Sequence, residues 1–139
     1  MQTSSGKRDN RKKVLEGLNN LEKVNINQKF SLFDEYWSPK IVGELNGQHV
    51  KLAKFKGKFI WHKHDNEDEM FYVIRGNFTM ELRDQVIELY EGEFFIVPKG
   101  IEHRPVAKEE VSVLLFEPKT TLNTGNQKNQ FTKENLQKI

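Results

Sequence analysis

Two histidines separated by one residue, His62 and His64, are the side chains of this sequence best suited to hold a metal ion. Successive side chains of an extended strand point to opposite faces, so the two imidazoles would project together while Lys63 points away. The preceding residues 58–61 are aromatic and β-branched, which favours a strand, and Gly57 would provide the turn that starts it. The pattern therefore predicts two imidazoles on one side of a strand, which is a chelating geometry.

Glu69 is the carboxylate that best completes this pair. The acidic residues 65–68 interrupt the apolar pattern as a hairpin loop would, and strand composition resumes at Glu69. Glu69 therefore opens the returning strand near the histidines, and it shares a face with Phe71 and Val73. A carboxylate on an apolar face is costly unless it is paired or bound to a cation.

Three other side chains compete for a role in this site and fit it less well. Asp68 would lie on the opposite face of the strand if the strand has already begun, and Glu67 belongs to the acidic loop. His49 lies away from the other candidate ligands, and we interpret it as an ordinary strand histidine. Glu69 is the carboxylate that we predict to act with the histidines.

A second segment, residues 92–103, contains a short apolar strand with Gly, Pro and Gly at its turns, and His103 begins the strand that follows. Residues 57–76 read GxxxxHxHxxxxExxxxxxG, and residues 92–103 read GxxxxxPxGxxH. Together these segments resemble the two signature motifs of the cupin superfamily. Two departures are the four residues between Gly57 and His62, where the family usually has five, and Ala107, where it usually has Asn. Neither departure changes a ligand.

The resemblance implies that His62, His64, Glu69 and His103 bind one divalent metal. Three imidazoles and one carboxylate suit a transition metal, namely Mn, Fe, Ni, Co, Zn or Cu. In a six-coordinate site these four ligands would leave two positions for water or substrate, as a catalytic site requires. Glu69 would then double as a catalytic proton acceptor.

Two classes of function are compatible with such a site. One is a metal-dependent enzyme, of the isomerase or oxygenase type, acting on a small polar substrate. The other is a non-catalytic module that binds or senses a small ligand or the metal. Residues 116–119 and 121–125 extend the resemblance to small bacterial cupins often labelled mannose-6-phosphate isomerase-like. A phosphate ligand would need an inward cation, and the sequence does not orient the candidates Lys51, Arg75 and Arg104.

The remaining pattern predicts an all-β protein, and the resemblance narrows this to a cupin jelly-roll barrel. Alternating segments bounded by turn signals predict strands at 40–45, 48–55, 78–83, 86–90, 94–97, 102–106 and 111–116. Apolar residues at helical spacing predict a short helix within residues 13–23. We expect three parts: an N-terminal arm and helix (1–24), the barrel (25–118), and a polar C-terminal tail (119–139) with a terminal helix or a clip onto the barrel.

Composition limits the remaining possibilities. A chain of 139 residues is long enough for one domain and too short for two cupin modules. The absence of cysteine leaves only N and O donors for a metal and suits the cytoplasm. The sequence has no apolar stretch long enough to span a bilayer and no secretory signal, and we interpret the basic cluster at residues 7–13 as a solvated arm that binds no nucleic acid. We expect a homodimer, with Phe33 and Trp37 either at its interface or capping the barrel.

Overall fold

The computed structural model describes residues 21–139, and these residues form an antiparallel β-barrel with one short helix. The elements in chain order are α2 (Ile26–Phe30), β1 (Lys40–Leu45), β2 (Gln48–Lys58), β3 (Glu69–Arg75), β4 (Asn77–Leu82), β5 (Val86–Tyr90), β6 (Phe94–Val97) and β7 (His103–Pro118). The all-β jelly-roll prediction is confirmed. None of the helices within residues 21–139 has the length and hydropathy needed to cross a membrane.

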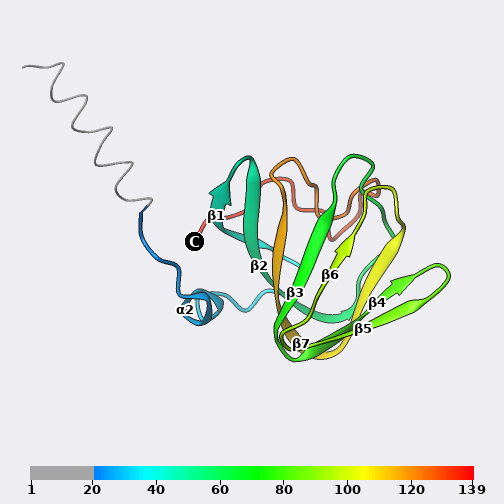
Figure 1. Cartoon of the computed structure of the whole chain (residues 1–139), viewed down its shortest axis with the longest axis horizontal. Helices are drawn as coiled ribbons and strands as arrows, with labels where there is room; N and C mark the ends of the chain where they lie inside the picture. The colour runs from blue at the N-terminus through cyan, green and yellow to red at the C-terminus, as the bar shows by residue number, and fades with distance from the viewer. Residues whose placement is uncertain (1–20) are drawn as a thin grey trace, which may run out of the picture.

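The long strand β7 joins the two parts of the barrel. Residues 103–106 of β7 pair with β4, which forms a hairpin with β5, whereas residues 111–118 pair with β2. The strand order around this centre is β1-β2-β7-β3-β6, and Figure 1 shows the β4–β5 hairpin extending from one side of the barrel. The sequence suggested two strands, 102–106 and 111–116, where the structure has one, because pairing with β2 continues on both sides of residues 108–110.

The hairpin of β1 and β2 forms as predicted. Asn46 and Gly47 both have positive φ, 49° and 76°, which is the backbone conformation that a two-residue hairpin turn requires. The pairing register between β2 and β7 shifts next to Gly57, which has φ +84° and lies in a β-bulge near the end of β2. Gly57 therefore lies within β2 and does not provide the turn that was expected to start a strand there.

The inner core is built around Trp37, whose ring stacks on Phe55 and Phe59 at centroid distances of 4.4 and 4.7 Å. Trp37 is buried and its indole nitrogen donates a hydrogen bond to the carbonyl oxygen of Lys56. Phe33 is also buried, in an outer layer with Phe30 and Leu52. Both aromatic side chains lie in the chain's own core, so the interpretation that they cap the barrel describes them.

The helix α2 supports this outer layer from outside β2 (Figure 1). Asn25 caps it by accepting a hydrogen bond from the backbone nitrogen of Gln28, at 3.0 Å. No helix was predicted in this region, because residues 25–33 show no clear pattern. Of the helix predicted at 13–23, residues 13–20 lie outside the described residues, and residues 21–23 are not helical.

Residues 119–139, which we call the C-terminal strap, cross one end of the barrel and return to β1 (Figure 1). The backbone of Ile41 pairs with Gln137 and Ile139 at 2.9 and 3.0 Å. Within the strap, the hydroxyl groups of Thr124 and Thr132 lie 2.7 Å apart in a hydrogen bond. The tail expected from composition is thus a clip onto the barrel, and its polar side chains bind backbone groups that would otherwise lack partners.

The strap's closest approach predicts a specific sensitivity at Gly125. Gly125 has φ +56°, and a Cβ atom there would overlap the carbonyl oxygen of Lys63. We expect Gly125→Ala to displace the strap and lower the free energy of unfolding by about 1–3 kcal/mol, measured by urea denaturation, with faster proteolysis within residues 119–139. Gly92→Ala is the matched control, because Gly92 has φ +82° with open space around it. Equal losses in both variants would show that the strap does not depend on this contact.

Candidate metal centre

The connection between β2 and β3, which we call the histidine loop (residues 59–68), is not the strand that the sequence suggested. Its one β-bridge joins His62 to His103, with backbone hydrogen bonds of 3.1 and 2.9 Å in the two directions. This pairing places the two imidazoles side by side, with ring centroids 4.2 Å apart. His103 therefore reaches the site because it opens β7 directly opposite the loop.

The histidine loop is held from a second direction by neighbouring segments. The backbone nitrogen of Gly100 donates to the carbonyl oxygen of His64 at 2.7 Å. Lys63 forms two hydrogen bonds with Asn126 of the C-terminal strap, both 3.0 Å long. With its neighbour fixed on both sides, His64 turns inward and is buried, while Lys63 stays partly exposed. The predicted alternation of these side chains therefore holds without a regular strand.

Glu69 is the first residue of β3 and only 4% exposed. It shares the inner face of β3 with Phe71 and Val73, as its position in the sequence predicts. Its Oε1 atom lies 3.2 Å from Nε2 of His64 and 3.5 Å from Nε2 of His103. The structure thus brings together His62, His64, Glu69 and His103, whose ligand atoms all lie within 4.8 Å of one another.

The orientation of two imidazoles is set by backbone carbonyl groups. Nδ1 of His62 lies 3.0 Å from the carbonyl oxygen of Ile60, and Nδ1 of His103 lies 2.9 Å from that of Ile101. A carbonyl oxygen can only accept, so each Nδ1 carries the proton and each Nε2 keeps a lone pair. This is the usual arrangement of a histidine that ligates a metal through Nε2.

The unpaired atoms of the cluster show that a cation would fit. Both ring nitrogens of His64, Oε1 of Glu69 and Nε2 of His103 are buried without a hydrogen-bond partner. The short separations among them lack hydrogen-bond geometry, and unpaired buried polar atoms are costly. A divalent ion among these atoms would satisfy three ligand atoms at once.

Burial and neighbouring charges shift the pKa values of the cluster, and the direction of the shift differs from one residue to another. Burial, together with the nearby His103, lowers the pKa of His62 to about 4, so this imidazole is neutral at pH 7. Burial alone would raise the pKa of Glu69, but the adjacent His103 and His64 outweigh it, and the net shift is downward. At His64, as at His62, burial disfavours the protonated imidazole. The Glu69 carboxylate outweighs this effect and raises the pKa of His64.

The rival ligands lie elsewhere. Glu67 accepts a hydrogen bond from the Thr120 hydroxyl at 2.9 Å, and Asp68 accepts one from the backbone nitrogen of Lys99 at 2.9 Å. The imidazole of His49 pairs with Glu44 at 3.2 Å. None of these three side chains is part of the cluster formed within residues 21–139.

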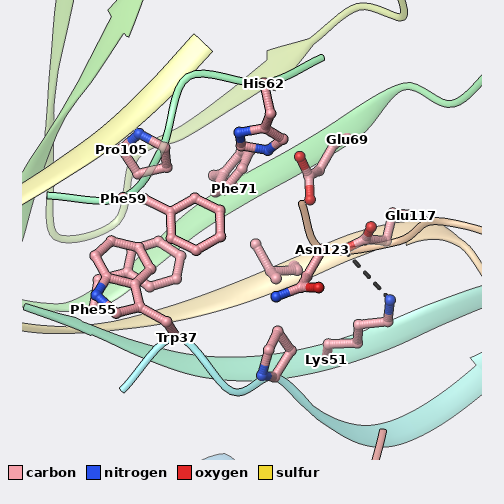
Figure 2. Close-up of a pocket in the computed structure, with 12 residues that line it drawn as sticks. Trp37, Lys51, Phe55, Phe59, His62, Glu69, Phe71, Pro105, Glu117 and Asn123 are labelled. Carbon is pink, nitrogen blue, oxygen red and sulfur yellow. Dashed lines mark ion pairs between the residues drawn. The ribbon is translucent and has the colours of Figure 1, made fainter. Parts of the chain in front are cut away.

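A small cavity of about 30 Å³ adjoins the cluster and includes His62 and Glu69 in its wall. By volume it holds about two water molecules. Figure 2 shows the aromatic rings of Trp37, Phe55 and Phe59 on one side. On the other side lie polar groups that sequence reasoning did not assign to the site: Lys51, Glu117 and Asn123.

Lys51 and Glu117 belong to the inner faces of β2 and β7, and both are buried. Because Met70 pairs with Phe116, the next residues of the same antiparallel ladder, Glu69 and Glu117, are neighbours. Burial and the nearby Glu69 raise the pKa of Glu117 well above its ordinary value, although Lys51 opposes this. The strand alternation of β2 was the signal that could have found Lys51, since it puts Lys51 on the same face as Phe55.

Comparison with known proteins agrees with this site. The family model for the Cupin domain matches residues 48–117, about half of the chain. The crystal structure of a cupin-2 domain protein from Shewanella frigidimarina is 43% identical, covering 73% of this chain and 98% of that one, with a TM-score of 0.69. Protein NMB1881 from Neisseria meningitidis is 31% identical, covering 70% and 99%, with a TM-score of 0.65.

A curated relative, the uncharacterized protein YdbB of Bacillus subtilis, is 34% identical over 64 residues. The match takes in 45% of this chain and 57% of the length of that relative. The matched family segment contains His62, His64, Glu69 and His103, and it also contains Lys51 and Glu117. On the family match and on these relatives, the chain belongs to the cupin superfamily.

Proposed function

We propose that the chain binds one divalent transition metal through His62, His64, Glu69 and His103, and that it is a metal-dependent enzyme acting on a small polar substrate. The observation that carries this proposal is the set of buried, unpaired donor atoms that converge within 4.8 Å. The donor set suits Mn, Fe, Ni, Co, Zn or Cu. The fold supplies the rigid support, because the ligands come from the histidine loop and the starts of β3 and β7.

The chain's own residues suit proton transfer at a carbon next to a carbonyl group, the first step of an isomerisation. A bound ion would supply Lewis acidity to an oxygen atom of the substrate. Glu69, whose carboxylate lines the cavity beside the cluster, would accept the proton. The rings of Trp37 and Phe59 form an apolar wall of the cavity beside it. An oxidation with dioxygen is the other reaction type that this donor set supports.

A non-catalytic role in binding or sensing a small ligand or the metal is the alternative function. The observation that favours it is the cavity volume of about 30 Å³, which leaves little room for a substrate unless neighbouring side chains move. A sugar-phosphate substrate, as in mannose-6-phosphate isomerase, is not part of the proposal. Arg75 binds Asn27 outside the barrel, and Arg104 pairs with Glu81, so neither supplies an inward guanidinium for a phosphate.

We also propose that the chain forms a homodimer through the outer face of its sheet. Register places one apolar row across β2, β7, β3 and β6, which consists of Val50, Phe116, Met70 and Ile96. Next to this row Tyr72 pairs with Phe94. Phe94 and Ile96 are 59% and 49% exposed, and a contiguous apolar surface of this kind is typical of an interface. A two-fold dimer would bury the same row from both copies.

Two expectations from the sequence stay predictions. The first is a cytoplasmic location, which rests on the absence of cysteine. The second is the division into residues 1–24, 25–118 and 119–139, in which the strap is a separate part that closes the barrel end.

Metal content tests the site directly. We expect the wild type, purified without added metal or an affinity tag that removes it, to hold about one equivalent of a transition metal, and His62→Ala/His64→Ala to hold almost none, measured by elemental analysis. The double variant should stay folded by circular dichroism because the hydrophobic core of the barrel is formed by other side chains. His49→Ala is the matched control and should keep its metal. Stoichiometric metal in the double variant would contradict the ligand assignment.

Hydrogen exchange separates the enzyme from the binding module. We expect the metal-loaded wild type to speed deuterium uptake from D₂O at the carbon next to the carbonyl of dihydroxyacetone or hydroxypyruvate, followed by NMR. Glu69→Gln at matched metal content should slow it by about 100-fold or more, because the proton acceptor is lost. Glu67→Gln is the control and should exchange normally. No exchange with the wild type would rule out this proton transfer and leave oxidation or the non-catalytic alternative, and equal exchange in Glu69→Gln would remove Glu69 as the acceptor.

Light scattering at micromolar concentration tests the dimer. The wild type should have twice the mass of one chain, and Ile96→Glu should be monomeric because a charge would be buried within the apolar interface. Val86→Glu alters another exposed apolar residue, on β5, and should leave the dimer intact. A monomeric wild type would rule out this interface.

A further inference from the structure

Lys51 and Glu117 form a buried ion pair for which the proposed metal chemistry has no use. Their side chains are 3% and 2% exposed. The ammonium nitrogen of Lys51 lies 3.7 Å from Oε1 of Glu117, which is beyond hydrogen-bond distance, and Oε2 of Glu117 is buried without a partner. Buried charges are normally compensated by close hydrogen bonds, so this pair is incompletely satisfied.

Lys51 lies where its unused hydrogen-bond donors can reach a ligand in the cavity. Lys51 and Glu117 line the same cavity as His62 and Glu69. In Figure 2 the polar groups extend along one side of the cavity from His62 through Glu69 and Glu117 to Lys51, facing the aromatic rings of Trp37 and Phe55. An ammonium group carries three donors, and Lys51 can therefore hold Glu117 and a ligand in the cavity together.

The charges and the volume restrict the ligand. With a divalent ion bound, the ion and the Lys51 ammonium together outweigh the carboxylates of Glu117 and Glu69 by about one positive charge, so a monoanion is neutralised and a phosphate dianion is not. A single Lys also lacks the planar fork with which Arg binds phosphate. Asn123 offers no further anchor, because its amide nitrogen donates to the Phe131 carbonyl and its oxygen accepts from Lys133. The cavity volume of about 30 Å³ requires a compact molecule.

We propose that Lys51, positioned by Glu117, binds the carboxylate of a short hydroxy- or oxo-carboxylic acid whose other oxygen reaches the metal centre. This inference rests on the proposed function, because the bound ion supplies both the second contact and the positive charge that balances the two carboxylates. The aromatic wall packs against the carbon atoms of the ligand. Lys51 thus determines the substrate class of the same site.

Calorimetric titration with glycolate tests this inference, using protein of measured metal content. Lys51→Met keeps the length of the side chain and removes its charge. It should bind glycolate about 10-fold or more weakly than the wild type, with unchanged metal content, because a charge-assisted hydrogen bond is lost. Ethylene glycol, which has the same size and no charge, should bind the wild type and Lys51→Met equally. Phosphate should bind more weakly than glycolate.

Glu117→Gln keeps the shape and removes the neighbouring carboxylate. It should bind glycolate at least as tightly as the wild type, and this variant decides the question if Lys51→Met does not fold. Equal glycolate affinity in Lys51→Met and wild type, weaker binding in Glu117→Gln, or tighter binding of phosphate would each overturn the proposal. If the wild type holds no metal, the proposed function fails and this inference fails with it. If the wild type holds its metal and binds glycolate no more tightly than Lys51→Met does, the role of Lys51 fails while the metal centre stands.

Discussion

The convergence of four buried side chains, three of which present ligand atoms without hydrogen-bond partners, is the constraint on which the rest of this structure depends. Three imidazoles and a carboxylate within 4.8 Å of one another would be expensive to bury unless a cation joined them. The backbone compensates for part of this by fixing the rings: carbonyl groups of Ile60 and Ile101 hold Nδ1 of His62 and His103. The ligand atoms that face one another keep no hydrogen-bond partner at His64, Glu69 and His103, and these atoms define the candidate metal centre.

The scaffold serves this cluster through two contacts with the histidine loop. One is the backbone bridge between His62 and His103, which couples the loop to the start of the longest strand. The other is the C-terminal strap, where Asn126 binds both backbone groups of Lys63. The strap also contributes Asn123 to the cavity wall. Residues far apart in the sequence therefore fix the loop that carries two of the four ligands, and the same contacts define how much room a ligand has.

Much of this architecture follows from the sequence because its signals are local. Asn46-Gly47 sets a hairpin turn, the alternation of β3 puts Glu69 with Phe71, and the spacing of two motifs predicts the ligands that the structure brings together. The missed features depend on long-range contacts. On β2, Val50 and Leu52 face outward and Lys51 faces the interior. This is the reverse of the usual pattern, in which polar side chains face solvent. It arises because α2 and neighbouring residues cover Leu52. The partners of Lys51 and Trp37 likewise come from distant strands.

The central claim is that the cluster binds a metal in the folded protein, and thermal denaturation after chelation tests it most directly. A ligand that binds only the native state raises the midpoint of unfolding. The account predicts that chelation lowers the midpoint of the wild type and that one of the divalent transition metals restores it, with saturation at about one equivalent per chain. An unchanged midpoint after chelation, with no response to any of these ions, would contradict the metal centre.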